Sequence, residues 1–282
     1  MSTSPWWVYP PTPRSPSAPG PCFGPEGIRS ASILLRDYNP ILEVSVPEVL
    51  SMVDYGDAPT VPGYHLESLA RIESFLSPIQ AAGVVPLVLG GDHSLTIASL
   101  RAAAATHGPV AVVHIDAHAD VLDSYYGVAH FHGTVFRRAV EEGLVDPSCS
   151  LQAGMRGSLH PGDLLGGAAF GYEVIWWEEL RQMSPEQFGQ AVRRRVGDRP
   201  VVVSFDIDFV DPAFAPGTGT PEPGGPTSYE ALSYVRSLGA MNYVGLECVE
   251  VAPSLDPTGV TLNLASSVCF ELLSLLALSR RR

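Results

Sequence analysis

The chain has 282 residues, a net charge of −13 and a hydrophobic share of 45%. This length suits one large α/β domain or two ordinary ones, and the hydrophobic share is ample for a core. With 17 Lys and Arg residues against 30 Asp and Glu, we expect neither nucleic acid nor an anionic membrane as a partner, because both are bound through positive charge.

The N-terminal segment shows no basic region followed by an apolar stretch, which predicts no signal peptide. Its proline-rich part, Pro10–Pro21, is expected to be an extended loop. The four cysteines form no CxxC pair, which indicates free thiols in a reducing compartment. No apolar segment reaches membrane-spanning length, and "FELLSLLALS" predicts a packed amphipathic helix. We therefore expect a cytoplasmic protein.

Short apolar runs alternate with helical patterns along the chain. The predicted strands are Trp6–Tyr9, Val84–Leu89, Val110–Ile115, Ser150–Gly154, Glu173–Trp176, Val201–Phe205 and Tyr243–Val249. The predicted helices are His65–Ala81, Leu95–Ala105, Thr134–Glu142, Pro185–Val196, Tyr229–Ser237 and Leu262–Leu278. Apolar strands separated by helices are typical of a parallel sheet covered on both faces. Without repeats or a linker, residues 1–282 are expected to form one domain.

Polar clusters follow three of these strands, in "VPLVLGGDHS", "VVHIDAHAD" and "VVVSFDIDFVDP". Alone, "GGDHS" could be a glycine turn capped by Asp92, and a single DxD is common in sugar-nucleotide or Mg²⁺ sites. Because the carboxyl ends of parallel strands meet at one edge of a sheet, the three clusters together predict one composite site.

In an extended segment, residues i, i+2 and i+4 point the same way. The clusters then supply four carboxylates and two imidazoles: His93, Asp116, His118, Asp120, Asp206 and Asp208. So many close carboxylates repel one another unless cations neutralise them. Six ligands suit two bridged metal ions able to generate hydroxide from water. Oxygen-rich coordination without thiolate favours Mn²⁺, with nickel, cobalt or zinc as alternatives.

The motifs "GGDHS", "DAHAD" and "SFDIDFVDPAFAPGTGTPEPGG" resemble the ureohydrolase family of arginases and agmatinases, and the likeness runs from about Gly20 to Leu278. The resemblance implies a three-layer α/β/α fold with a central, mostly parallel sheet (the arginase-like fold). It also implies two manganese ions per chain, hydrolysis of a guanidino substrate to an amine and urea, and assembly into a trimer or hexamer.

The resemblance also implies roles for the six ligands. His93 would bind one ion alone and His118 the other, while Asp116 and Asp206 would bridge the pair. Asp120 and Asp208 would complete the two shells.

By the same resemblance, His132 would protonate the departing amine and Glu250 would hold the substrate guanidinium. Asp208 would help Glu250 to stabilise the tetrahedral intermediate. A histidine suits proton transfer because its pKa lies near neutrality. His130 has no counterpart in the family, and Glu247 is the less favoured acid of its segment.

Gly157 follows "GMR" where arginases carry an acid that contacts the α-amine, which argues against arginine as the substrate. The segments "FHGTVFRRAVEEGLVDP" and "EPGG" resemble the agmatinase branch most, so the expected substrate is agmatine. The loops Val121–Phe131 and Gly157–Gly166 are expected to shape the pocket for the substrate tail. Tyr125 and Tyr126 are expected either to contact that tail or to pack on a neighbouring subunit. The N-terminal turn also departs from the family pattern, with Thr12 and Arg14 replacing an acid and a glycine.

Other guanidines therefore remain alternatives: guanidinobutyrate, guanidinopropionate, a proclavaminate-type substrate or a larger secondary metabolite. Further alternatives are cleavage of a different C–N bond and a non-catalytic subunit with this fold.

Overall fold

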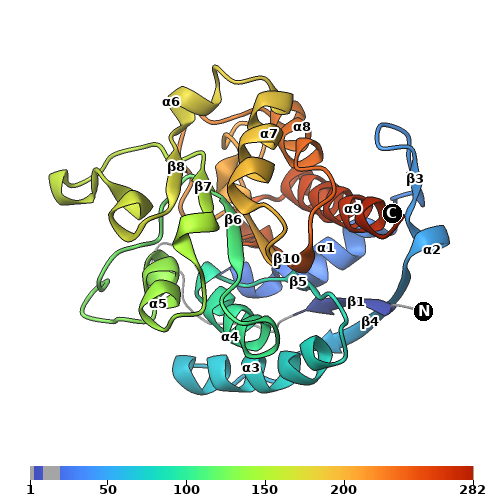
Figure 1. Ribbon diagram of the computed structural model, residues 1–282, viewed down its shortest axis with the longest axis horizontal. Helices are drawn as coiled ribbons and strands as arrows, with labels where there is room; N and C mark the ends of the chain where they lie inside the picture. Colours follow the sequence, from blue (N-terminus) through green and yellow to red (C-terminus); the bar gives the residue numbers. More distant parts are fainter. Residues whose placement is uncertain (1–2, 9–19, 282) are drawn as a thin grey trace.

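The structure, a computed structural model, describes residues 3–8 and 20–281 (Figure 1). Its main sheet has eight strands in the order β4-β1-β5-β10-β9-β6-β7-β8, and each neighbouring pair is parallel. The strands are β1 (Thr3–Val8), β4 (Ser51–Asp57), β5 (Leu87–Leu89), β6 (Ala111–Ile115), β7 (Leu151–Ala153), β8 (Glu173–Ile175), β9 (Val201–Asp206) and β10 (Tyr243–Val249). A small antiparallel pair, β2 (Tyr38–Asn39) and β3 (Val44–Ser45), lies apart from it.

Helices cover both faces of this sheet (Figure 1). One layer contains α3 (His65–Ala81), α4 (Thr96–His107) and α5 (Val135–Glu141). The other contains α1 (Gly24–Ser32), α7 (Pro185–Val196), α8 (Ser228–Ser237) and α9 (Val260–Arg280), with the short helices α2 (Val46–Val49) and α6 (Trp177–Leu180). Alternating strand residues enter two separate apolar cores, as Leu87 and Val88 do. The expected three-layer α/β/α fold is confirmed.

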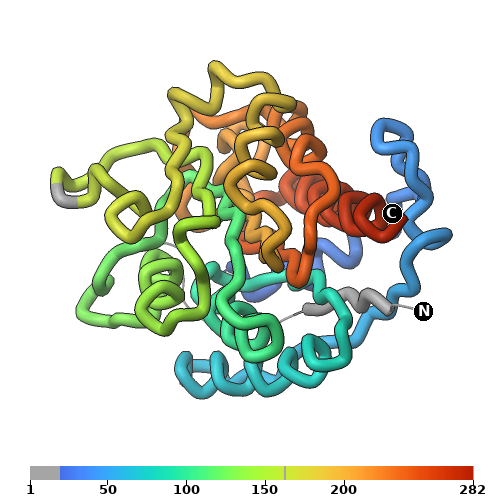
Figure 2. Tube along the Cα trace, in the orientation of Figure 1, coloured from blue at the N-terminus to red at the C-terminus, as the bar shows by residue number. Residues whose placement is uncertain are grey.

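The strand order brings distant parts of the chain together at the centre of the sheet. After β5 the chain crosses through α4 to β6, three places away, and β9 and β10 later fill the gap. The blue-green and orange parts of the trace in Figure 2 consequently lie side by side. The carboxyl ends of β5, β10, β9 and β6 therefore form a continuous edge, which is where ligands bind in such sheets.

Some elements differ from the prediction. The first strand runs over Thr3–Val8 instead of Trp6–Tyr9, and Ser51–Asp57 and Gly24–Ser32 are a strand and a helix that were not predicted. Residues 10–19 of the predicted loop Pro10–Pro21, with Thr12 and Arg14, lie outside the described residues.

The C-terminal helix is longer than expected. By length and composition α9 could cross a membrane, contrary to the prediction that no segment is long enough, yet 72% of its most apolar window is buried in the protein. Residues that follow one another in the helix are both buried, as in the pairs Leu272–Leu273 and Leu275–Leu276. The helix is therefore covered on most sides, as a core helix is, and is not amphipathic.

Candidate metal centre

The turn after β5 places His93 at the sheet edge. The strand leads through Gly90 and Gly91 to Asp92, whose Oδ1 accepts the N–H of Ser94 at 3.0 Å and caps the 3-10 turn His93–Leu95. A Cβ at Gly90 would lie 2.6 Å from Cγ1 of Val249 on β10. The glycine thus lets the two strand ends approach closely.

The segment after β6 bends, so the expected alternation along an extended strand is wrong. Residues 116–118 form a bend, in which Asp116 Oδ1 accepts the N–H of His118 at 2.6 Å. Asp120 follows with a left-handed φ of 51°. The three side chains still converge, but a side-chain-capped turn brings them together.

The end of β9 repeats this design. Asp206 Oδ1 accepts the N–H of Asp208 at 2.8 Å and caps the 3-10 turn Ile207–Phe209. Asp208 is therefore not two residues along a strand, as predicted, but lies on the turn. Its carboxylate accepts the N–H of Ala117 at 3.2 Å and the hydroxyl of Thr220 at 3.1 Å.

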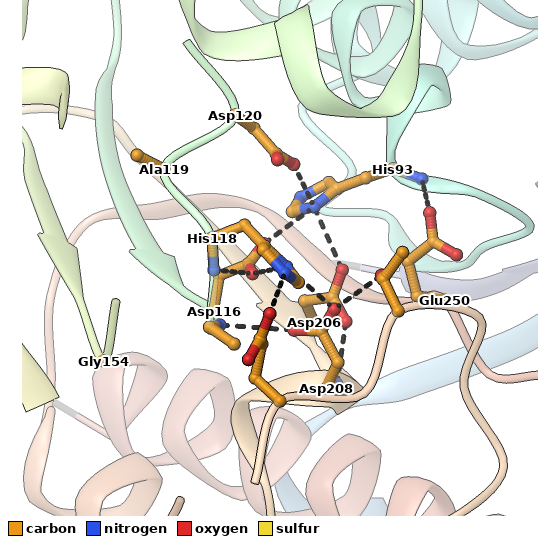
Figure 3. A network of polar contacts seen from close by, with 12 residues as sticks. His93, Asp116, His118, Ala119, Asp120, Gly154, Asp206, Asp208 and Glu250 are labelled. Atoms are coloured by element: carbon orange, nitrogen blue, oxygen red, sulfur yellow. Dashed lines mark hydrogen bonds and ion pairs between the residues drawn. The ribbon is translucent and has the colours of Figure 1, made fainter. Parts of the chain in front are cut away.

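His93 is surrounded by carboxylates (Figure 3). Its Nδ1 lies 3.0 Å from Asp116 Oδ2, 3.1 Å from Asp120 Oδ2 and 3.2 Å from Asp206 Oδ2. Nevertheless this buried nitrogen makes no hydrogen bond with any residue that the structure describes. Neighbouring ligands of a six-coordinate ion with bonds of about 2.1 Å are roughly 3.0 Å apart. The spacing therefore fits ligand atoms around a cation.

His118 forms the second half of the cluster. Its Nδ1 lies 3.0 Å from Asp208 Oδ2 and 3.4 Å from Asp116 Oδ1. Asp116 thus faces both histidines, one with each oxygen, as a bridging ligand would. Two overlapping groups of side chains could hold a metal, one around His93 and one around His118, and both include Asp116.

The charges in the cluster are poorly compensated by the protein. Burial and the carboxylates of Asp208 and Asp116 raise the pKa of Asp206 well above its usual range. Burial lowers the pKa of His93, but Asp116, Asp120 and Asp206 outweigh it and raise this pKa well above the ordinary value. Both shifts mean that the site attracts positive charge. Divalent cations satisfy this demand, and the carboxylate and imidazole donors suit Mn²⁺.

Sequence reasoning missed a buried polar layer beneath the ligands. His114 Nε2 lies 2.7 Å from Asp116 Oδ2, Ser204 Oγ lies 2.8 Å from His93 Nε2, and Gln152 Nε2 lies 2.9 Å from His114 Nδ1. His114, Ser204 and Gln152 lie side by side on adjacent strands. Outer partners of this kind orient metal ligands. Their only signal in the sequence is a polar residue inside an apolar run.

Glu250 lies beside the cluster in a strained conformation, with φ of 61°. Its Oε1 accepts the N–H of His93 at 2.8 Å (Figure 3). The N–H of Glu250 donates to the carbonyl oxygen of Gly91 at 2.9 Å. The other oxygen, Oε2, is buried and has no hydrogen-bond partner within the described part of the chain. Glu250 thus offers a fixed acceptor to a ligand.

His132 contacts the same carboxylate, with Nδ1 3.3 Å from Glu250 Oε1. Burial lowers the pKa of His132, but Glu250 outweighs this effect and raises it to about 9. Burial also raises the pKa of Glu250, against the opposing effect of His132. The pair therefore presents a protonated imidazole at neutral pH.

A cavity of about 300 Å³ opens onto these groups. Its described lining includes Asp120, Asp206, Asp208, His118, His132 and Glu250, together with Val121, Leu122 and Tyr125 and with Ser158–His160, Asp163 and Gly166. Both predicted loops therefore contribute to the wall. Tyr126 is 84% exposed, so of the two tyrosines only Tyr125 lines the cavity.

The two residues not favoured by the sequence lie elsewhere. Glu247 is buried and accepts the hydroxyl of Thr96 at 2.7 Å. Neither Glu247 nor His130 is among the described residues that line the cavity.

Comparisons with known proteins agree with this arrangement. Residues 10–274 match the Arginase family. The chain is 44% identical to guanidinopropionase of Pseudomonas aeruginosa, over 93% of this chain and 83% of that protein. It is also 44% identical to mitochondrial agmatinase of Gallus gallus, over 92% and 76%. Proclavaminate amidinohydrolase of Streptomyces clavuligerus superposes with a TM-score of 0.92 and 38% identity, covering 99% of this chain and 93% of that one.

Proposed function

The chain belongs to the Arginase family and is a hydrolase of guanidino compounds, and on that premise we propose that it cleaves agmatine to putrescine and urea with two manganese ions. The observation that carries the proposal is the buried Nδ1 of His93, which faces three carboxylate oxygens at 3.0–3.2 Å without a hydrogen bond.

In the proposed site, His93, Asp116, Asp120 and Asp206 would hold one ion, and Asp116, His118, Asp206 and Asp208 would hold the other. A bound pair of divalent cations supplies a nucleophilic oxygen at neutral pH and stabilises negative charge on the reacting centre. The protein's own task is to place the guanidinium carbon and to supply a proton.

Glu250 performs the placement. Its free Oε2 accepts guanidinium N–H groups, while the N–H of His93 keeps Oε1 in position at 2.8 Å. A charge-assisted contact of this kind fixes the orientation of the substrate. Asp208, which lines the same cavity, would help to hold the tetrahedral intermediate.

His132 supplies the proton. Its Nδ1 faces Glu250, which leaves Nε2 to reach the departing amine, and at neutral pH the ring is protonated. Transfer of that proton as the C–N bond breaks releases a neutral amine instead of an amide anion.

The cavity wall favours a substrate with a cationic tail. Asp163 and Glu222 add carboxylates to the wall, and Arg156 is the only Arg or Lys in its described lining. The guanidinium of Arg156 donates to the main-chain oxygens of Glu222 and Asp208 and is thus not free to bind a substrate carboxylate. Agmatine, with its terminal ammonium group, meets these conditions better than a guanidino acid.

Urea release by the manganese-loaded enzyme tests the proposal, on agmatine, arginine, 4-guanidinobutyrate and 3-guanidinopropionate at equal concentrations. We expect the highest kcat/KM for agmatine. A preference for either guanidino acid would contradict the assignment of agmatine but retain the mechanism. No urea from any of the four compounds would contradict the assignment of agmatine and would indicate a larger guanidine or a non-catalytic subunit.

The oligomeric state and the compartment also belong to the proposal. We expect a trimer or hexamer in the cytoplasm, so light scattering should give three or six times the 30.1 kDa of one chain.

A further inference from the structure

We infer that Glu222 is a positioning residue for His118, the candidate ligand of the second ion. Its Oε1 lies 3.8 Å from His118 Nε2, on the side of the ring away from the cluster. This role rests on the proposed metal site and adds an outer contact to it.

The tautomer of His118 explains why a carboxylate is needed there. The Nδ1 atom faces Asp208 and Asp116, so it is the nitrogen that would bind the metal. The ring proton must then lie on Nε2, which becomes a donor that needs an acceptor. Histidine ligands almost always donate this proton to a carboxylate, a carbonyl or water. Glu222 provides the carboxylate, with Oε1 3.8 Å from Nε2 and thus just outside direct hydrogen-bond range.

The neighbouring glycine makes room for this carboxylate. Gly157 has a φ of +83°, and a Cβ on it would lie 2.4 Å from Glu222 Oε2. Any side chain at position 157 would therefore displace the carboxyl group of Glu222. A side chain at position 157 and the carboxyl group of Glu222 would therefore compete for the same volume. In this chain Glu222, on the loop after β9, occupies it.

The backbone of Glu222 is held in place independently. Arg156 donates to its carbonyl oxygen from Nε at 3.1 Å and from Nη2 at 2.7 Å. Asp211 Oδ2 accepts the N–H groups of Gly224 and Gly225, at 2.7 and 3.1 Å. Pro221 and Pro223 restrict the chain on both sides. Such a fixed backbone limits the positions that the carboxylate of Glu222 can reach.

The side chain of Glu222 remains partly accessible to solvent and to ligands. Its side chain is 26% exposed and that of His118 is 32% exposed, since both line the cavity. A substrate could therefore also touch Glu222, and the experiment has to separate this contact from an effect on the metal.

The test measures Mn²⁺ affinity, by following free Mn²⁺ with electron paramagnetic resonance as the metal-free protein is titrated. We expect Glu222→Ala to weaken the binding of one of the two ions by roughly 10–100-fold, the usual effect of losing an outer partner. Glu222→Gln should restore most of the affinity, because its amide oxygen can still accept the Nε2 proton.

Asp163→Asn is the matched control, because it removes a carboxylate from the same cavity without a described contact to His118. We expect it to bind both ions as the wild type does. Thermal unfolding of metal-free Glu222→Ala at the wild-type temperature would show that the loop is intact.

Three results would overturn the inference. Wild-type affinity for both ions in Glu222→Ala would show that His118 does not depend on Glu222. A changed preference among guanidines with unchanged Mn²⁺ affinity would make Glu222 a substrate contact. If the wild type binds no Mn²⁺, the proposed function itself fails, and the inference fails with it.

Discussion

The carboxylates of Asp116 and Asp206 each combine a contact with the backbone and a contact within the cluster. Oδ1 caps the turn that follows the strand, and Oδ2 faces His93. The turn therefore fixes the direction of the ligand oxygen before any metal binds. A change at either residue affects both the local backbone and the charge of the cluster.

Asp206→Asn separates these two contributions. The amide oxygen can still accept the N–H of Asp208, but the variant should lose Mn²⁺ binding and turnover, as should Asp206→Ala.

The raised pKa of the Asp206 carboxyl group means that the folded chain keeps a proton which the unfolded chain has lost. The free energy of unfolding therefore falls as pH rises from about 4 toward the folded pKa. Metal-free Asp206→Asn does not lose stability in this way, because the amide carries no charge at either pH.

In the presence of EDTA at pH 8, we therefore expect Asp206→Asn to unfold at a temperature a few degrees above the wild type, since a gain on the order of 1 kcal/mol has that effect. Scanning calorimetry of both proteins measures the difference. A lower unfolding temperature for the variant would show that Asp206 does not carry the excess negative charge.

His132 gives a prediction about pH. Its pKa of about 9 means that the imidazole is protonated below that value and loses its proton above it, and bound cations draw the pKa down. The rate should therefore decrease with rising pH at or below about pH 9. His132→Asn should lower kcat by roughly 10²–10⁴-fold, remove this decrease and leave Mn²⁺ affinity unchanged. A variant that keeps the wild-type pH profile would exclude His132 as the acid.

At the scale of the elements, the buried strands were predictable because their apolar runs leave little choice. The predicted strand Tyr243–Val249 agrees in both ends with β10. By contrast, β4 has the mixed sequence "SMVDYGD" and lies at the sheet edge with several exposed residues, so no hydrophobic period marks it. Helix α1, "GPEGIRSAS", contains two glycines and is stabilised by packing that a local pattern cannot reveal.

The same contrast holds for the site. The meeting of its six candidate ligands at one edge of the sheet could be predicted from the strand ends. The expected alternation along an extended segment was wrong, because the chain turns after β6 and β9. His114 and Gln152 could not be predicted, since their contact depends on β6 lying next to β7. Strand order is a property of the whole sheet, and no local spacing encodes it.

The close approach of β5 and β10 leads to a prediction at Gly90. Alanine there would place a Cβ 2.6 Å from Val249 Cγ1. This clash would push the two strand ends apart and so move His93 away from Glu250. We expect a loss of about 1–3 kcal/mol in the free energy of unfolding, together with weaker Mn²⁺ binding. Gly83→Ala is the control, because its φ of +71° strains the backbone while nothing lies within 4 Å of the new Cβ.

That control should lower stability but keep the Mn²⁺ affinity of the wild type. Denaturant unfolding and metal titration of both variants measure the two effects separately. Equal Mn²⁺ affinity in Gly90→Ala and the wild type would show that the strand ends tolerate separation.

At the scale of the whole molecule, the candidate ligands come from three strand ends, between His93 and Asp208, and Glu250 follows a fourth. Strands β9 and β10 separate β5 from β6 in the sheet, so the cluster exists only when all four central strands are paired. The unfolded chain holds no such site. Metal binding is therefore coupled to folding of the central sheet, and not to one loop.

Removal of the metal should consequently destabilise the entire fold. An ion present at 100 times its Kd adds about 2.7 kcal/mol, and in a domain of this size each kcal/mol raises Tm by roughly 2–4 °C. For two ions we expect Mn²⁺ to raise Tm by on the order of 10 °C or more and EDTA to reverse the change, as scanning calorimetry would show. Asp206→Ala, which cannot hold the pair, should show no shift. A wild-type Tm that does not respond to Mn²⁺ would mean that the carboxylate cluster is not a metal site.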